Sequence, residues 1–570
     1  MNNNILQAEF IDSPDTVDFI IRQSEAFNNL IRDHPNVFLP TQVLSGRYVI
    51  GYINHEEIDS VMENLGTSFV SALPIILGLL DYANLDAAGI IQVQQQPYLN
   101  LRGQGVLIGF VDTGIDYTKS AFIYEDGTSK IQYIYDQSER SGTTPEGFFI
   151  GTEYTNKDIN EALRSENPYE IVPQKDTVGH GTFLASLAAS RESGEYIGAA
   201  PDAEMIVVKL KNARPYYREL YLVPPEQQNA YESTAVMIGI EYILKKAKEL
   251  NRPVAICIGV GSNTGSHDGF SLFEEYLSNA ANLAGHCICT AAGNESQARH
   301  HTQGVITATG GTNTIEIKVG ENAGNILVNI WNLASDRFSV SITSPTGEVV
   351  GRVPARSGTI LRTRLILERA TVVVEYYFPV EGGGGQVSVV KILNATPGVW
   401  TITVYGDIIL DGTYHAWLPL TGFVSPVVEF LAPNPNFTIV VPATSTNVIT
   451  CGAYNSNSNS LFAKTSWGPT RLPAVSPDLV GPGVNVGGIY PNGYGTMDGT
   501  SAANAILTGA GALMLQWGIV QGNDPGLSTY QIRSYLIRGC TRDPNTQYPN
   551  NQWGYGKLNL IQSFNLMRER

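Results

Sequence analysis

Four continuous apolar runs, separated by stretches with a helical repeat, constrain this sequence more than any other feature. The runs are Val106–Val111, Met205–Val208, Val254–Ile258 and His286–Ala291. A strand that is apolar at every position is buried on both faces, as in a parallel sheet covered by helices. Between the runs, Ser233–Leu250 has the apolar spacing of a helix. The alternation predicts an α/β fold whose parallel sheet carries helices on both faces.

The α/β pattern occupies only part of the chain, which at 570 residues is too long for one core of ordinary size. The pattern covers residues 97–300 and resumes over 436–570. Residues 301–435 are rich in Thr, Val and Ile, with short alternating runs separated by turn residues and no helical period. We therefore expect an inserted antiparallel β-sandwich at 301–435.

Residues 1–96 predict a separate small α+β unit ahead of the α/β domain. Tyr48–Tyr52 reads as a strand, and His55–Leu65 has the apolar spacing of a helix. Phe69–Leu80 is apolar but too short to span a bilayer and contains a proline, so we expect it to be buried core. Ile90–Pro97 is uncharged and ends at a proline, which predicts an extended segment joining the unit to the α/β domain.

Charge and cysteine content exclude several kinds of partner. The net charge of −17 disfavours a nucleic-acid backbone. The N-terminus has neither the basic region nor the apolar region of a signal peptide, which predicts synthesis in the cytoplasm.

The cysteines match no zinc pattern, and we expect them to be buried and reduced. Cys287 and Cys289 are expected on opposite sides of a strand. A redox or catalytic cysteine is the alternative.

Three short motifs place chemically useful side chains at the ends of predicted elements. Asp112 ends the first apolar run, His180 opens one helical stretch and Ser501 opens another, each flanked by glycine or threonine. A serine hydroxyl is a weak nucleophile that needs a base, an imidazole can take its proton, and a buried carboxylate orients the imidazole. Taken singly, the three could be a turn residue, a helix-end histidine and an N-cap. Their order predicts a catalytic triad.

Asn294 follows the run that begins at His286, and its side-chain amide could complete an oxyanion hole with the Ser501 N–H.

Asp116 and Asp176 lie near the motifs, and we expect them to be solvated or hydrogen-bonded loop groups. His300 and His301 resemble a metal pair but lack carboxylates close by in the sequence. The sequence contains no EF-hand loop, so no metal or other cofactor is expected, although acidic loops could hold Ca²⁺.

On these motifs the sequence resembles the subtilase family of serine proteases. Further landmarks are the segments 197–210, 442–454, 465–470, 476–486 and 553–559. The resemblance implies that Gly259, Val260 and Gly261 pair with the backbone of an extended peptide substrate. Subtilases usually follow the serine with Met-Ala-Ala/Thr-Pro, whereas this chain has Ala502 to Ala505 with Asn504 inside the run. The departure affects helix packing more than chemistry.

We interpret residues 1–96 as a pro-domain. The chain combines this pro-domain, the lack of a signal peptide, an intact triad and a sandwich inserted between Asn294 and Ser501. In this combination it resembles the clostridial Csp spore-germination proteases, on their active, CspB-like branch. The resemblance implies a jelly-roll insertion and a pro-domain that stays bound after autoprocessing. It also implies a spore location, a spore cortex lytic enzyme zymogen as substrate and pseudoprotease paralogues as further partners. The rivals are a silent pseudoprotease in germinant signalling and a general intracellular subtilase.

The linking segment is the expected site of self-cleavage, because it is uncharged and was predicted to be extended. We therefore expect the chain to cut itself within Gln94, Gln95, Gln96 and Pro97. The pro-domain's last strand would then stay in the cleft as an inhibitor or chaperone.

Overall fold

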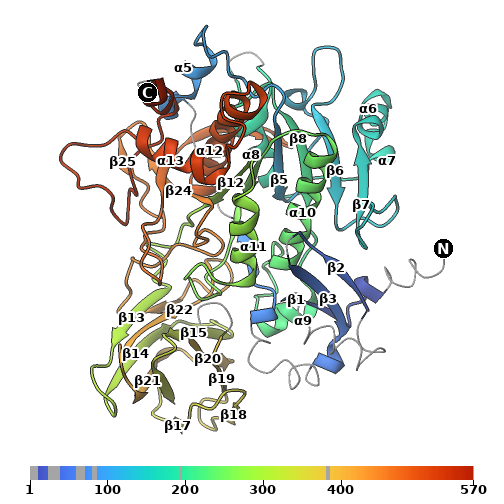
Figure 1. Ribbon diagram of the computed structural model, residues 1–570. Helices are drawn as coiled ribbons and strands as arrows, with labels where there is room; N and C mark the ends of the chain where they lie inside the picture. The colour runs from blue at the N-terminus through green and yellow to red at the C-terminus, as the bar shows by residue number, and fades with distance from the viewer. Residues whose placement is uncertain are drawn as a thin grey trace.

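The computed structural model describes residues 10–23, 39–45, 47–58, 71–79, 86–192, 196–380 and 385–568. Its centre is a large sheet, shown in Figure 1. In spatial order the sheet contains β25 (Ser460–Leu461), β24 (Ile449–Asn455), β12 (His286–Ala291), β10 (Val254–Ile258), β5 (Leu107–Asp112), β8 (Glu204–Lys209), β6 (Ile131–Asp136) and β7 (Thr152–Thr155), and β26 (Leu479–Pro482) pairs with β24. Pairing is parallel except at β7 and β25. The four apolar runs thus form the predicted parallel strands.

Alternate residues of these strands enter two separate cores, as the period-2 geometry of a strand requires. On β5, Ile108 and Phe110 pack in one core, whereas Leu107 and Val111 pack in the other. The first core is covered by α8 (His180–Ala189), α12 (Thr500–Leu515), α13 (Thr529–Gly539) and α14 (Leu560–Arg568), and the second by α10 (Ser233–Glu249) and α11 (Leu272–Ala281). Helices therefore cover both faces of the sheet, as expected from the sequence.

One helix in the described part of the chain, Thr500–Val520, is long and apolar enough to cross a membrane by length and composition alone. It comprises α12 and the π-helical turn η4 (Gln516–Val520), and most of it is buried inside the α/β domain, which the resemblance given above makes the expected catalytic domain. We therefore interpret its apolar character as that of a core helix.

The N-terminal unit contains a small antiparallel sheet in the order β1 (Thr16–Arg22), β3 (Tyr48–Asn54) and β2 (Leu39–Val43). The predicted strand is therefore present. Of the predicted helix, only the turn η1 (His55–Glu57) and Ile58 are described, and its remainder lies outside the described residues. The buried run near residue 75 forms β4 (Ile76–Leu79), which leaves this unit and enters the catalytic domain.

The expected extended conformation of Ile90–Pro97 is wrong. Residues Ile90–Gln94 form α5, preceded by the turn η2 (Asp86–Ala88). Ile90 and Val93 are three residues apart on one face of α5, and both are buried in the core that α14 covers. The Gln94 side chain is also buried and donates to the carbonyls of Gly198 and Ala199, both at 2.9 Å. Apolar burial at helical spacing outweighed the weak local preference for extended backbone, and these residues pack against the core of the α/β domain.

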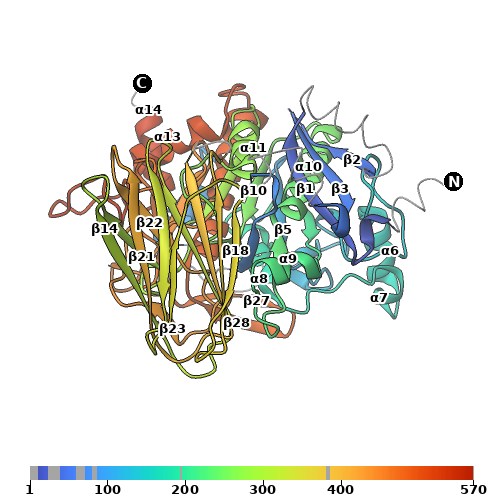
Figure 2. The same ribbon diagram turned by 90° about the horizontal axis from the view of Figure 1, so that it is seen from below.

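The insertion is a β-sandwich of two antiparallel sheets around its own apolar core. One sheet contains β13 (His301–Val305), β22 (Thr413–Trp417), β15 (Ile326–Asn332), β20 (Gln386–Leu393), β19 (Thr371–Tyr377) and β18 (Ile360–Arg364); the other contains β17 (Val349–Val353), β16 (Arg337–Thr343), β21 (Gly398–Ile408), β14 (Thr312–Val319) and β23 (Val428–Phe430). In Figure 1 the sandwich lies below the large sheet, with the β1–β3 sheet at its right. Figure 2 shows the sandwich and the β1–β3 sheet from below.

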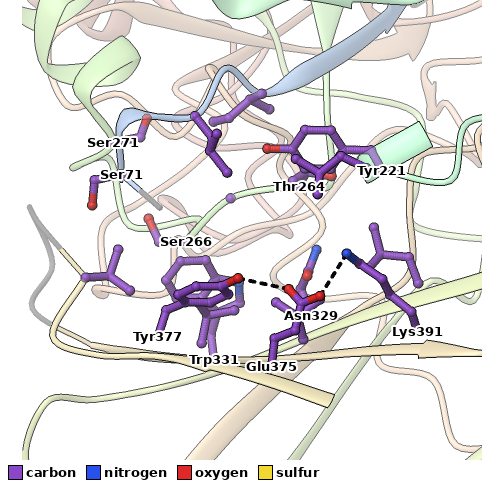
Figure 3. Close-up of a pocket in the computed structure, with 18 residues that line it drawn as sticks. Ser71, Tyr221, Thr264, Ser266, Ser271, Asn329, Trp331, Glu375, Tyr377 and Lys391 are labelled. Atoms are coloured by element: carbon purple, nitrogen blue, oxygen red, sulfur yellow. Dashed lines mark hydrogen bonds and ion pairs between the residues drawn. The ribbon is translucent and has the colours of Figure 1, made fainter. Parts of the chain in front are cut away.

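An apolar hollow lies where the sandwich, the catalytic domain and the N-terminal unit meet (Figure 3). Trp331 and the partly buried ion pair between Lys391 and Glu375 face it from the sandwich, with Lys391 Nζ 3.1 Å from Glu375 Oε1. Tyr221 faces it from the catalytic domain, and Ile75 precedes β4 at its edge. The three parts of the chain therefore share one contact region beside β4.

The five cysteines are free thiols buried in the catalytic domain. Cys287 and Cys289 lie two residues apart on β12 and point to the same side, with their sulfur atoms 3.7 Å apart. The expectation that they face opposite sides is wrong, because side chains repeat with a period of two along a strand. Both sulfurs pack in the core shared with α12.

Candidate active site

The three motif residues come from three elements that meet at the carboxyl end of the sheet. Asp112 ends β5 on the same face as Phe110, which is the face covered by α8. His180 is the first residue of α8, and its Nδ1 lies 2.7 Å from Asp112 Oδ1. Ser501 is the second residue of α12. All three are buried, so the sheet and two helix N-termini place the predicted residues in one site.

Gly259, directly after β10, is the point at which the three side chains converge. Ser501 Oγ donates to the carbonyl of Gly259 at 3.0 Å. A Cβ atom on Gly259 would lie 3.0 Å from Asp112 Oδ2 and 3.1 Å from the Cε1 atom of His180. Glycine at this position therefore leaves room for the Asp–His pair beside the serine.

A hydrogen-bond network centred on Asp176 joins the aspartate-bearing loop to the histidine-bearing helix. Asp176 Oδ1 accepts from Thr113 Oγ1 at 2.8 Å and from the N–H of Gly179 at 2.7 Å, and Oδ2 accepts from the N–H of Thr182 at 2.9 Å. Thr113 Oγ1 in turn accepts from the N–H of Gly181 at 2.9 Å. The expected loop role of Asp176 is thus structural, but it fixes the residues next to both Asp112 and His180.

Asp116 is also a hydrogen-bonded loop group, as expected. Its Oδ1 accepts from Thr118 Oγ1 at 2.6 Å and from the hydroxyl of Tyr169 at 3.1 Å, and Lys119 Nζ lies 3.3 Å from Oδ2. These partners hold the turn that follows the Asp112 motif.

Asn294 lies beside the start of α12. Its Oδ1 accepts from the N–H of Thr500 at 3.2 Å, and the N–H of Gly293 donates to Thr500 Oγ1 at 3.1 Å. Because Oδ1 is committed to Thr500, the amide group has a fixed orientation next to Ser501, with its Nδ2 donors on the opposite side. The role of Asn294 as a side-chain donor to a developing oxyanion stays a prediction.

Glu295 fixes the loop that carries Asn294 through contacts with three other residues. Its Oε2 accepts from Asn263 Nδ2 at 2.9 Å and contacts His300 Nδ1 at 2.8 Å, while Oε1 accepts from the N–H of Thr421 at 3.2 Å. Burial opposes ionisation, but the attraction of His300 and these hydrogen bonds hold the pKa of Glu295 below its ordinary value. His301 points elsewhere, to the carbonyl of Asn434 and to His415, so the two adjacent histidines do not share a site.

The strand β4 occupies the groove beside the triad. Leu79 and Gly78 pair antiparallel with Val260 and Gly261 of β11 (Val260–Gly261). On its other edge, Leu77 and Ile76 pair antiparallel with Tyr231 and Glu232 of β9 (Tyr231–Glu232). An extended peptide thus lies between two short strands of the catalytic domain, one of which directly follows Gly259. Sequence reasoning anticipated the first strand and missed β9, which has no motif.

The departure after the serine has a structural counterpart. Asn504 Nδ2 donates to the carbonyl of Ile258, the last residue of β10, at 3.0 Å and to that of Cys289, within β12, at 3.3 Å. The Asn504 side chain therefore ties the first turn of α12 to the sheet on which the site is built.

The site brings together a serine hydroxyl, an imidazole bonded to a carboxylate, a side-chain amide, and strands that hold an extended peptide. Together with the fold, these parts define the class of subtilisin-type serine peptidases. The sequence profile of the subtilase family matches residues 103–347 and 431–556, more than half of the chain, and the chain belongs to that family.

Two known proteins are similar to the chain, one over most of its length and one over a shorter part. The CspB protease of Clostridium perfringens has a solved structure that is 32% identical, with a TM-score of 0.74; the match covers 85% of this chain and 99% of that one. Serine protease AprX of Bacillus subtilis is 32% identical over 151 residues, which make up 22% of this chain and 31% of AprX. The chain thus matches less than a third of AprX but nearly all of the CspB structure.

Proposed function

We propose that this chain is an endopeptidase that first cuts itself on the C-terminal side of Leu79 and then cuts one protein substrate in the same groove. The observation that carries the proposal is β4, which lies antiparallel to β11 in the groove beside Ser501. The earlier expectation, a cut within Gln94–Pro97, is less compatible with the structure. Gln94 is buried in α5, and its side chain is bonded to Gly198 and Ala199. These two residues bond to the C-terminal end of α8, whereas His180 lies at the N-terminal end of that helix.

The geometry supports the following steps. Ser501 attacks the carbonyl of the bound peptide while His180 takes its proton, because the Nδ1–H donated to Asp112 assigns the role of base to the other ring nitrogen, Nε2. The N–H of Ser501 and the Asn294 amide stabilise the oxyanion of the tetrahedral intermediate. His180 then returns the proton to the leaving amine. Water releases the acyl group from Ser501 by the same route.

The N-terminal unit stays bound after the cut in this proposal. Arg214 of the catalytic domain forms a buried ion pair with Asp18 on β1, with Nε 2.7 Å from Oδ1. Arg214 also donates to the carbonyls of Ile11 at 2.7 Å and Thr16 at 3.2 Å. These contacts do not depend on an intact chain between β4 and α5.

The physiological substrate that we propose is the zymogen of a spore cortex lytic enzyme, cut during germination in the spore. The support is the similarity to CspB across 85% of the chain together with the resemblance to the Csp proteases. Purified wild-type protein is expected to cut this zymogen at one bond and to leave casein largely intact. Broad digestion of casein would instead favour a general degradative subtilase.

A silent regulatory protein is a second candidate function. It is favoured by the burial of β4 in the groove, where Leu77 is fully buried and Ile76 nearly so. Such a protein would keep its groove filled and act through binding, with pseudoprotease paralogues among its partners.

Intact mass of the wild type beside Ser501→Ala separates these functions. We expect two wild-type fragments whose boundary follows Leu79 and one full-length mutant species. A boundary within Gln94–Pro97 would refute the revised cut but retain the protease. A cut Ser501→Ala chain, or an uncut wild type, would remove the case for self-processing.

A further inference from the structure

At Gly78 the side chains of the groove lie close against the backbone of β4. Gly78 lies in an extended strand, a conformation that any residue can adopt, so its backbone does not require glycine. The space around it does: a Cβ atom there would lie 2.5 Å from the Cε2 atom of Phe423 and 3.0 Å from Leu420 Cδ2. Real Cβ contacts essentially never fall below 3.0 Å, so a side chain would have to displace the phenylalanine ring.

The segment that carries Leu420 and Phe423, which we name the wall segment (residues 418–424), follows β22 of the inserted sandwich. The N–H of Leu418 donates to the carbonyl of His300 at 2.9 Å, and the N–H of Thr421 donates to Glu295. On the other side, Gln227 donates to the carbonyl of Gly422 at 3.3 Å. The wall segment is therefore tied to the loop behind Asn294 and to the catalytic domain.

Both wall side chains are buried in an apolar cluster that joins all three parts of the chain. The cluster contains Phe19 and Ile53 of the N-terminal unit, Val440 of the catalytic domain, and Leu420 and Phe423. A ring held in such a cluster cannot move without disturbing the packing around it. The wall is therefore a fixed boundary of the groove.

We infer that the wall segment forms a subsite that accepts only glycine. Substrates then present an extended run in which two apolar residues precede the glycine and one apolar residue follows it. This inference rests on the proposed function and assigns its substrate class. Ile76, Leu77 and Leu79 define the apolar positions around Gly78, and Phe423 with Leu420 excludes any larger residue at the glycine. The insertion thereby selects substrates, in addition to the rigidifying role expected of a packed domain.

The test is a double-mutant cycle in the full chain. Self-cleavage is followed by intact mass after cell-free synthesis in wild type, Gly78→Ala, Phe423→Ala and the double variant. We expect Gly78→Ala to slow cleavage at least tenfold in the wild-type background, but less than threefold when Phe423→Ala has opened the wall. Gly351→Ala is the matched control, because that glycine lies on a strand with nothing within 4 Å of an added Cβ.

A second cycle in the Ser501→Ala background reads the same subsite without cleavage. There Gly78→Ala and Phe423→Ala together should lower the melting temperature by less than the sum of the single effects, because they relieve one clash. Additive melting shifts, or unchanged cleavage by Gly78→Ala, would overturn the subsite. An uncut wild type with non-additive melting shifts would instead refute the proposed function and retain the subsite.

Substrate selection itself is read from a peptide library digested by cleaved Asp18→Ala protein, from which the N-terminal unit and β4 with it are separated before the assay. Cut sites should show glycine at the position equivalent to Gly78, and the preference should weaken in Phe423→Ala. Cut sites with larger residues at that position would overturn the assignment.

Discussion

At the scale of single residues, the site depends on side chains that carry no reaction chemistry. Thr113 and Asp176 fix the loop of Asp112 against the first turn of the helix that begins with His180. The carboxylate of Asp176 is buried and accepts from backbone and hydroxyl donors, so its loss would leave those donors unpaired. We therefore regard Asp176 as a positioning residue.

Replacing Asp176 with alanine should lower kcat by about 10- to 100-fold with little change in KM, because His180 would lose its fixed position while the groove is unaltered. The free energy of unfolding should fall by roughly 1–3 kcal/mol for the unpaired donors. Asp176→Asn, which keeps one acceptor oxygen, should recover part of both losses. Peptide hydrolysis and calorimetry measure these effects, and a raised KM with unchanged kcat would contradict a positioning role.

At the scale of elements, α11 illustrates how a helix terminus is held inside the protein. Ser271 caps the helix, and its N–H and hydroxyl donate to Glu274 Oε2 at 3.2 and 2.7 Å. Thr444 donates to the other oxygen of the carboxyl group. Burial raises the pKa of Glu274 to about 7, with Asp268 adding to the rise and the hydrogen bonds opposing it.

This raised pKa makes stability fall with pH. The folded value of about 7 exceeds the ordinary 4.5, so the contribution is fully present below about pH 4.5 and is lost as the pH rises through 7. Glu274→Gln cannot ionise, and it should reduce the decline in the free energy of unfolding between pH 5 and 8 by an amount on the order of 3 kcal/mol. Urea unfolding at several pH values measures the slope. Glu56→Gln, at an exposed carboxylate, is the control, and equal slopes in Glu274→Gln and wild type would refute the prediction.

At the scale of the whole molecule, the N-terminal unit is attached by a buried charge cluster. Arg214 contacts Asp18 of β1, and its backbone N–H donates to Glu232 of β9 at 2.6 Å. Burial works against the charge on Asp18, but Arg214, Lys211 and the side-chain hydrogen bonds to Asp18 together outweigh it and lower the pKa of Asp18 to about 2. This attachment is therefore at full strength above the ordinary pKa of 3.8 and weakens as the pH falls towards 2.

Asp18→Ala should loosen the cleaved N-terminal unit, because it leaves the Arg214 charge buried without its closest partner. Breaking a buried pair from one side costs about 3–5 kcal/mol, which corresponds to a more than 100-fold weaker attachment. Size-exclusion chromatography of the cleaved protein should then separate the unit from the variant but not from the wild type. Arg22→Gln is the control, because its ion pair with Glu275 is partly exposed and worth about 1 kcal/mol or less. Equal retention in Asp18→Ala and Arg22→Gln would contradict the anchoring role.

The sequence by itself determined the four buried parallel strands and the sandwich, and it located the three residues that we propose as the triad. The strands were readable because a strand buried on both faces must be apolar at every position, as Val254–Ile258 is. The triad was readable because Asp112, His180 and Ser501 each stand at an element end within a short motif. In these cases the information is local to a few neighbouring residues.

Only the tertiary structure decided what fills and bounds the groove. Nothing near Gly78 in the sequence indicates Phe423, which lies more than 300 residues later and reaches the groove through the inserted sandwich. The same holds for the contact of Arg214 with Asp18. Local pattern even misled for Ile90–Gln94, where burial against α14 and its neighbours produced a helix. Contacts between distant segments depend on how whole elements pack, and a local pattern of residues does not encode them.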